Sequence, residues 1–323
     1  MNLDFNMMKT YKLCVETCMG IKEGERVLIV TNDINMEIAE GLAIISYMKN
    51  ADPYILSHTS LKRFDVEPPE LISGCMKKAD VVLIALSFFE GANFFHTQAR
   101  KDLIKRGGRF AMVWITPEIA KITKEEIFET KAFSEKMAKI LTHAKMARVL
   151  TEAGTDITMN IEGRNSVMIS SILDKPGDSG TIPDFAEAAI APIEGSSEGI
   201  VVIDGNMAGF ENLIINPIIL RVEKGRVVEI TGKEEAFNLK QLLKDKDENS
   251  VNIAELGIGV IDRYKISGGP DDKKILGTGH IAIGDNRFGG GNITSAVHLD
   301  AVFKNMTLEI DGKLIMENGI LKI

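Results

Sequence analysis

The sequence predicts an α/β protein, with an open parallel-sheet N-terminal domain followed by a β-rich α+β C-terminal domain. In the first part of the chain, short continuous runs of Val, Ile and Leu alternate with amphipathic helical stretches. This alternation is typical of a parallel sheet that is covered on both faces. Further on, short strand-like segments are separated by Gly, Asn and Asp. We therefore expect two domains, residues 1–150 and 151–323, a number that the chain length also favours.

The elements of the first domain follow from hydrophobic periodicity. Short apolar runs indicate buried strands, whereas apolar residues three and four positions apart indicate helices. A long helical segment with Met137, Leu141 and Ala144 on one face closes the domain. The expected strands are residues 27–30, 53–56, 81–86 and 110–114, and the expected helices are residues 36–49, 67–76, 97–106 and 124–147.

The second domain is expected to be built from shorter strands and one helix. Asp311 and Gly312 separate the last two strands, which is a strong signal for a two-residue hairpin turn. The expected helix covers residues 234–244. The expected strands are residues 155–161, 167–170, 199–203, 218–222, 227–230, 252–261, 307–310 and 313–316.

Composition excludes several classes of partner. The net charge of −8 argues against nucleic acid, because phosphate binding needs a concentrated basic surface. No apolar run approaches the length of a membrane span, and the first twelve residues lack the apolar stretch of a signal peptide. The three cysteines, Cys14, Cys18 and Cys75, form no disulfide framework and fit a cytoplasmic protein. We expect Cys14 and Cys18 to be buried structural thiols.

Nucleotide binding is not favoured. The turn after the first strand, residues 31–35, contains no glycine and no phosphate-binding Lys-Ser or Lys-Thr pair. Gly257-Ile258-Gly259 and Gly289-Gly290-Gly291 lack the spacing of a dinucleotide fingerprint, so we expect them to form structural turns.

Residues that commonly bind metal ions gather in the second domain instead. His298 and Asp300 are two residues apart and would share one face of a strand. His280 lies in a Gly-rich apolar run, and Glu255 and Glu187 interrupt apolar segments. Because a buried carboxylate needs a cationic partner, the five residues together predict a divalent metal site, and two imidazoles with three carboxylates would suit two ions.

The order and local context of these five residues resemble the aminopeptidase T family of metallopeptidases. The resemblance includes Ala153-Gly154-Thr155-Asp156 at the opening of the β-rich domain. It implies a homodimer that hydrolyses a small peptide or an amino-acid-derived substrate, with two Zn, Co or Mn ions activating water. The implied metal ligands are Glu187, Glu255, His280, His298 and Asp300.

The resemblance also suggests catalytic residues. Glu255 would combine its role as a ligand with one in catalysis. Arg287 stands where that family has a Tyr, seven residues after His280, and would stabilise the oxyanion. We therefore expect a metal-dependent aminopeptidase-like hydrolase.

Two alternatives remain open. The His298-Leu299-Asp300 motif is also similar to that of the 2,5-dihydroxypyridine dioxygenases, which implies a single Fe(II) and ring cleavage with O₂. The segment around Phe95-His96 resembles the one that supplies a catalytic His in that family, so His96 is a candidate proton shuttle. Because Glu187, Glu255 and His280 match the peptidase pattern, the hydrolase is preferred. The third alternative is a metal-binding protein without turnover.

Overall fold

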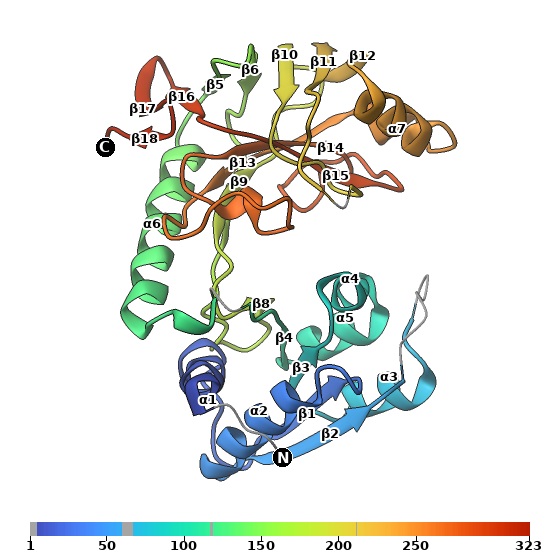
Figure 1. The fold of residues 1–323 in the computed structure, drawn as a ribbon, viewed down its shortest axis with the longest axis vertical. Coiled ribbons are helices and arrows are strands. Elements are labelled where there is room, and N and C mark those ends of the chain that lie inside the picture. Colours follow the sequence, from blue (N-terminus) through green and yellow to red (C-terminus); the bar gives the residue numbers. More distant parts are fainter. Residues whose placement is uncertain (1–4, 60–66, 117–118, 211) are drawn as a thin grey trace. The chain divides into compact units, whose positions relative to one another are not determined.

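The computed structural model describes residues 5–59, 67–116, 119–210 and 212–323 (Figure 1). The chain forms two compact units. Unit 1 consists of Met1–Lys131 and Ser170–Phe185, and unit 2 of Ala132–Ile169 and Ala186–Ile323. The expected mixed α/β fold, with one parallel sheet and further antiparallel sheets, is confirmed.

The two units do not meet at the single boundary near residue 150 that the sequence predicts, because each consists of two separate segments of the chain. Strand β5 (Met146–Leu150) belongs to unit 2, because it pairs with β6 (Asp156–Asn160) and β16 (Thr307–Ile310). Strand β8 (Ser179–Ile182) returns to unit 1, because it pairs with β4 (Arg109–Val113). Pairing between distant segments therefore decides which unit each segment joins.

Unit 1 is built on a five-stranded sheet, sheet A, with the order β2-β1-β3-β4-β8 and parallel pairing throughout. The four expected strands are present, and β8 is an addition whose Ser-Gly-Thr-Ile sequence gives little strand signal. The further strands of sheet A are β1 (Arg26–Thr31), β2 (Asp52–Ser57) and β3 (Val81–Ala85).

Alternate side chains of sheet A pack into two separate cores. Val27 and Ile29 of β1 join a cluster that includes Leu42 and Ile45 of α2. The neighbouring side chains of β1 join the other cluster, together with Leu103 of α5. Both faces are thus covered, as continuous apolar strands predict. The helices are α1 (Phe5–Lys12), η1 (Leu13–Cys18), α2 (Met36–Met48), α3 (Glu70–Met76), α4 (Phe88–Ala92), η2 (Asn93–His96), α5 (Gln98–Lys105) and η3 (Ile119–Lys121).

Helix α6 (Lys124–Thr142) runs from unit 1 into unit 2 and ends five residues before the expected residue 147. It ends there because Met146 already pairs with Asn160 in the sheet. Strand formation between residues distant in sequence thus overrides the local helical periodicity.

Unit 2 contains two sheets whose named strands all pair in antiparallel fashion around one core. Sheet B has the order β12-β11-β10-β6-β5-β16-β17-β18, and sheet C has the order β15-β14-β13-β9-β7. Apolar residues of both sheets, α6 and α7 form a single hydrophobic cluster. The remaining elements are β7 (Val167–Ile169), β9 (Glu187–Ile190), β10 (Glu198–Ile203), β11 (Ile218–Glu223), β12 (Arg226–Thr231), α7 (Glu234–Leu243), η4 (Glu248–Val251), β13 (Ile253–Gly259), η5 (Asp272–Lys274), β14 (Gly279–Gly284), β15 (His298–Phe303), β17 (Lys313–Glu317) and β18 (Ile320–Leu321).

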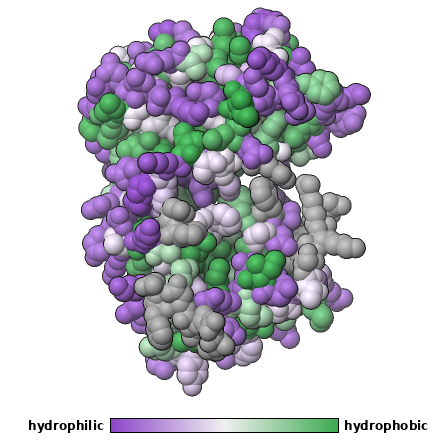
Figure 2. Space-filling view, in the orientation of Figure 1, coloured by the Kyte–Doolittle hydropathy of each residue, from purple (hydrophilic) through white to green (hydrophobic). Residues whose placement is uncertain are grey.

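The surface is mixed in character. Figure 2 shows hydrophilic side chains over much of the visible face, with apolar groups scattered between them. Among the residues that the structure describes, no helix combines the length and apolar character needed to cross a membrane.

The structure predicts which cysteines react. Cys14 and Cys18 are buried, and burial raises the pKa of both thiols, so they should resist a thiolate-selective reagent in the folded protein. Cys75 is exposed. We expect titration with a coloured disulfide reagent to detect one thiol per native chain, none in Cys75→Ser, and all three of the wild type in denaturant. Rapid reaction of more than one native thiol would contradict this burial.

Candidate metal centre

The five expected ligands lie on one face of sheet C. The opposite face carries apolar side chains, among them Leu256, Ile258, Ile281 and Ile283, that pack into the core of unit 2. Because side chains alternate along a strand, the residues between them point to the other face. That polar face carries Glu187 on β9, Glu255 and Gly257 on β13, His280 and Ala282 on β14, and His298 and Asp300 on β15.

A β-bulge turns Glu255 toward this face. The register of β13 against β14 shifts between Ile253 and Glu255. Ile253 packs in the core, and in a regular strand the side chain two positions later would point the same way. The additional residue, Ala254, reverses the alternation and aims the carboxylate of Glu255 at the site.

Small residues leave room above the sheet for the polar side chains. Ala282 pairs with Glu255 on one side and with Asp300 on the other, so these two carboxylates converge over a methyl group. Gly257 pairs with His280, and a Cβ at Gly257 would lie 1.9 Å from Cε1 of the imidazole. The expectation of a turn at Gly257 is therefore wrong, because this glycine lies within a strand and lets the ring lie against the backbone.

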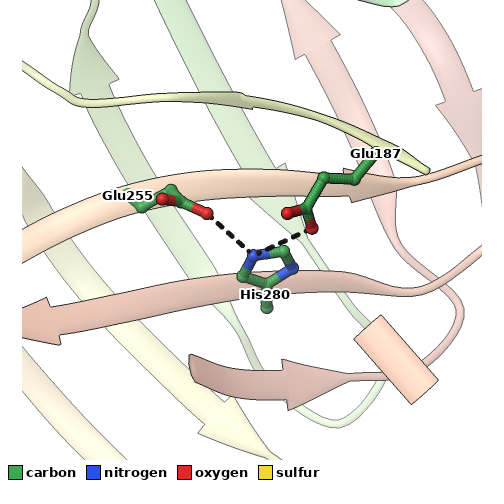
Figure 3. Close-up of side chains that lie close together, drawn as sticks. All are labelled: Glu187, Glu255 and His280. Atoms are coloured by element: carbon green, nitrogen blue, oxygen red, sulfur yellow. Dashed lines mark hydrogen bonds and ion pairs between the residues drawn. The ribbon is translucent and has the colours of Figure 1, made fainter. Parts of the chain in front are cut away.

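His280 is the centre of the first ligand group, with Glu187 and Glu255 (Figure 3). Its Nε2 lies 3.1 Å from Oε1 of Glu255 and 3.6 Å from Oε2 of Glu187. All three side chains are buried. The start of β9 is held in place by Ser134 of α6, whose hydroxyl donates to the carbonyl oxygen of Glu187 at 2.7 Å.

Glu255 also belongs to a second ligand group, with His298 and Asp300. Nε2 of His298 lies 3.7 Å from Oε2 of Glu255 and 3.4 Å from Oδ1 of Asp300. Nδ1 of His298 lies 2.7 Å from the carbonyl oxygen of Asp285. Because a carbonyl only accepts, Nδ1 carries a proton, and Nε2 faces the two carboxylates as a ligand nitrogen should.

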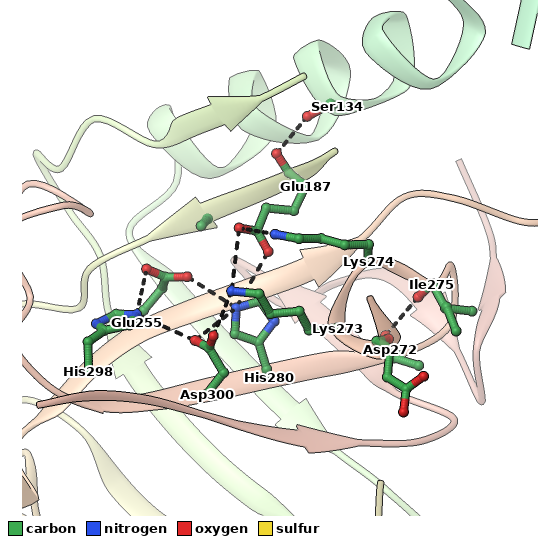
Figure 4. Close-up of polar contacts among 12 residues, drawn as sticks. Ser134, Glu187, Glu255, Asp272, Lys273, Lys274, Ile275, His280, His298 and Asp300 are labelled. Carbon is green, nitrogen blue, oxygen red and sulfur yellow. Dashed lines mark hydrogen bonds and ion pairs between the residues drawn. The ribbon is translucent and has the colours of Figure 1, made fainter. Parts of the chain in front are cut away.

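Two lysines of η5 reach into the same cluster (Figure 4). Nζ of Lys273 donates to Oδ2 of Asp300 at 2.6 Å and lies 4.0 Å from Oε1 of Glu187. Nζ of Lys274 lies 2.5 Å from the same oxygen of Glu187. The Lys274 side chain is 1% exposed, so its charge depends on this partner. The sequence had not pointed to either lysine.

The charges of the cluster shift its pKa values strongly. Burial would raise the pKa of Glu187, but Lys273 and Lys274 outweigh it and lower the pKa to about 2. Burial would likewise raise the pKa of Asp300, and Lys273 holds it well below its usual range. Burial lowers the pKa of Lys274 to about 8 against the pull of Glu187. Glu187 and Asp300 are therefore ionised at neutral pH.

The pKa of His298 is shifted in the opposite direction, upward. Burial would lower its pKa, but the carboxylates of Asp300 and Glu255 outweigh burial and raise the pKa to about 9. In the metal-free protein a proton on this imidazole therefore helps to balance the carboxylate charge.

The donor set fits a divalent cation. Imidazole nitrogen and carboxylate oxygen are the ligands that Fe, Zn, Co and Mn take in proteins. Oδ1 of Asp300 and Oε2 of Glu187 are buried and make no hydrogen bond within the part of the chain that the structure describes. Unsatisfied buried oxygens that point into one cluster are what a missing cation would leave. The two groups share Glu255, so the cluster offers room for one ion or two.

Two other expected residues lie outside both ligand groups. Arg287 is 60% exposed, and its guanidinium binds the carboxylate of Asp285, with Nη2 at 2.7 Å from Oδ2. His96 ends η2 in unit 1, and its role as a proton shuttle stays a prediction.

The residues that sequence analysis missed are Lys273, Lys274 and Asp285. The lysines belong to an Asp-Asp-Lys-Lys run, which has the composition of an exposed turn. Asp285 orients His298 through its backbone carbonyl oxygen, and a backbone contact of this kind cannot be predicted from the residue type.

Fold and site define a two-unit α/β protein whose antiparallel sheet presents a histidine–carboxylate cluster of the kind that holds divalent cations. The sequence profile of the 2,5-dihydroxypyridine 5,6-dioxygenase (NicX) family matches residues 6–323. The chain therefore belongs to this family.

Individual relatives agree with this assignment. The 2,5-dihydroxypyridine 5,6-dioxygenase of Pseudomonas putida KT2440 is 24% identical over 238 residues, which cover 69% of this chain and 67% of the relative. The solved structure of 2,5-dihydroxypyridine dioxygenase from the same organism aligns over 98% of this chain and 96% of its own, with a TM-score of 0.79 and 18% identity. Wild-type AmpT from Thermus thermophilus aligns over 98% and 99%, with a TM-score of 0.70 and 17% identity. The two structural alignments show a shared fold.

The expected aminopeptidase-like hydrolase is therefore wrong. The family match overturns it, and the kinship to aminopeptidase T is limited to the fold. The family match and the curated dioxygenase relative support the expectation of an enzyme but not of a peptidase. The role of Arg287 in stabilising a peptide-derived oxyanion is withdrawn with the hydrolase. The physical reason for the error is that both kinds of enzyme use imidazole and carboxylate ligands, so residue type does not separate them.

The close approach of Gly257 to His280 gives a test of the site. Gly257→Ala should push the imidazole of His280 out of place and release Glu255, whose Oε1 lies 3.1 Å from Nε2 of His280. It should weaken Mn(II) binding by at least about tenfold, as loss of ligand orientation does elsewhere. Isothermal titration calorimetry measures the change. Gly74→Ala is the matched control, because a Cβ there meets nothing within 4 Å. Unchanged affinity in Gly257→Ala would show that His280 does not position the metal ligands.

Metal binding should also stabilise the fold. An ion that binds only the folded state at 100 times its Kd adds about 2.7 kcal/mol, which raises the melting temperature by a few °C. We expect Mn(II) to produce this rise in the wild type and in His143→Ala, whose imidazole is exposed, but not in His298→Ala. Differential scanning calorimetry with and without a chelator measures it. An equal rise in His298→Ala would show that the ion binds elsewhere.

Proposed function

We propose that this chain is a ring-cleaving dioxygenase that acts on a dihydroxylated pyridine with the help of one bound Fe(II). The observation that carries the proposal is the family match over residues 6–323. The name of the family describes attack by O₂ at ring positions 5 and 6 of 2,5-dihydroxypyridine. The proposed reaction consumes one O₂ and places both oxygen atoms in the ring-opened product.

The proposed iron site is the group of Glu255, His298 and Asp300, with His280 close beside it. Nε2 of His280 lies 3.7 Å from Oδ1 of Asp300, so two imidazoles border this carboxylate. Non-haem Fe(II) oxygenases most often use two histidines and one carboxylate. The group here has one histidine and two carboxylates, and His280 is the second imidazole beside it. Bound Fe(II) would supply the electron-transfer chemistry that lets an aromatic ring react with O₂.

The protein side chains would orient this site and leave one side open. Lys273 holds Asp300, and the carbonyl of Asp285 holds the imidazole of His298. The side chains of Glu255 and His280 are at most 2% exposed, whereas those of Asp300 and His298 are 16% and 32% exposed. We therefore infer that the ring approaches from the β15 side of the cluster.

The chemistry of the substrate suits this environment. A ring hydroxyl is a weak acid, and its deprotonated oxygen is a good ligand for a divalent cation. The ammonium group of Lys273 lies at Asp300, next to the open side, where it would favour an anionic oxygen. The small peptide expected from the sequence belongs to the withdrawn hydrolase. The expected homodimer is kept as a proposal that analytical ultracentrifugation would test.

Oxygen uptake tests the proposed reaction. The protein loaded anaerobically with Fe(II) should consume one O₂ per 2,5-dihydroxypyridine, with loss of the aromatic absorbance. His298→Ala should reduce this rate by at least about a hundredfold, since even residues that only orient a ligand contribute 10–100-fold, and His143→Ala should retain it. With ¹⁸O₂, mass spectrometry should find both labelled atoms in the product. Disappearance of the ring without O₂ consumption would overturn the proposal.

A further inference from the structure

The lysines of η5 occupy the part of the cluster that a second metal ion would need. Glu187 belongs to the first ligand group, and a second ion would have to bind it together with Glu255 and His280. Yet Oε1 of Glu187 already lies 2.5 Å from Nζ of Lys274 and 4.0 Å from Nζ of Lys273. Two ammonium groups thus approach the oxygen that would hold the second cation (Figure 4).

The backbone fixes the position of the lysines. The carbonyl oxygen of Lys274 accepts hydrogen bonds from the amides of Val260 and Ile261, at 2.8 and 2.9 Å. A Cβ at Gly259 would lie 2.0 Å from the carbonyl oxygen of Ile275, so η5 packs directly against the end of β13.

Asp272, the residue before the lysines, anchors the same turn. Its buried carboxylate accepts hydrogen bonds from the amides of Ser267 and Gly268 and from the side chain of Asn206. The hydroxyl of Thr278 donates to its carbonyl oxygen at 2.9 Å. The backbone of η5 is therefore held by hydrogen bonds of its own, and the positions of Lys273 and Lys274 do not depend on their flexible side chains alone.

We propose that Lys273 and Lys274 take the place of a second metal cation, so that the cluster binds a single divalent ion at Glu255, His298 and Asp300. Glu187 is then the partner of the lysines and not a ligand. This inference rests on the proposed function in one respect, namely that a divalent ion binds the cluster at all.

Charge balance supports a single ion. Three carboxylates and two ammonium groups leave the cluster with one net negative charge when both imidazoles are neutral. One divalent ion changes this to one positive charge, whereas two ions would leave three. Uncompensated charge is unfavourable in a buried site, and a second ion would also lie beside the ammonium groups.

The number of ions determines the chemistry that the site can perform. Two adjacent ions can share a water molecule and polarise a carbonyl group, as dinuclear hydrolases require. A single ion has no such partner. The two lysines would therefore be specificity-determining residues, which exclude two-metal hydrolysis from a cluster that otherwise has enough ligands for it.

Metal stoichiometry tests the inference. Chelator-treated protein is dialysed anaerobically against excess Mn(II), and bound metal is counted by elemental analysis. We expect one ion per chain in the wild type and in Lys240→Met, an exposed lysine of α7 that serves as the control. Lys273→Met removes one ammonium group from Asp300 and Glu187 and should bind up to two ions. Two ions in the wild type, or none, would overturn the inference, as would one ion in both Lys273→Met and Lys274→Met.

A second pair of variants decides the question if the lysine variants do not fold. Glu187→Gln should change the Kd for Mn(II) by less than about threefold, because Glu187 is not a ligand, whereas Glu255→Gln should raise it by at least about a hundredfold. Equal losses in the two variants would overturn the inference. The assay uses neither O₂ nor a dihydroxypyridine. A protein that binds one Mn(II) but lacks dioxygenase activity would therefore contradict the proposed function alone.

Discussion

The burial of three carboxylates on one face of sheet C is the constraint on which the rest of the site depends. Glu187 and Glu255 are almost fully buried, and Asp300 lies between two imidazoles. Ionised carboxylates this close repel one another, and water is largely excluded from screening them. The lysines of η5, the protonated His298 and a divalent cation are the positive groups that can balance this charge. The anchored turn of η5 and the hydrogen bond between Asp285 and His298 hold two of these positive groups in place.

The other face of sheet C makes this arrangement possible. Its apolar side chains pack in the core of unit 2, where each buried Leu or Ile contributes roughly 1.5–3 kcal/mol. This packing fixes the strand register, and a register slip by one residue would exchange the polar and apolar faces. The bulge at Ala254 serves both requirements, because it keeps Ile253 in the core while Glu255 turns to the site. Apolar packing on one face of sheet C therefore stabilises the strands that bring the charged side chains together on the other face.

Sequence periodicity was sufficient to predict the parallel sheet of unit 1 and the grouping of ligand-type residues in unit 2. A short continuous apolar run is consistent with few structures other than a buried strand, and charged residues within apolar segments are easily recognised. Pairing between distant segments was not predictable in this way. Strand β8 joins sheet A from residues 179–182, and β5 shortens the expected long helix. The strand position of Gly257 was also missed, because a glycine needed for close packing against His280 looks the same in sequence as one needed for a turn.

The error in function has a similar origin. The five ligand-type residues do lie together, but imidazole and carboxylate ligands serve hydrolases and oxygenases alike. In the single-ion site inferred above, the two chemistries are separated by the positive charge that the protein itself contributes around the ligands. Lys273 and Lys274 lie within an ordinary charged run that gives no sign of a site, yet they contact two of the three carboxylates. A ligand motif thus indicates that a metal binds, while the number of ions depends on residues outside the motif, whose positions only the folded chain defines.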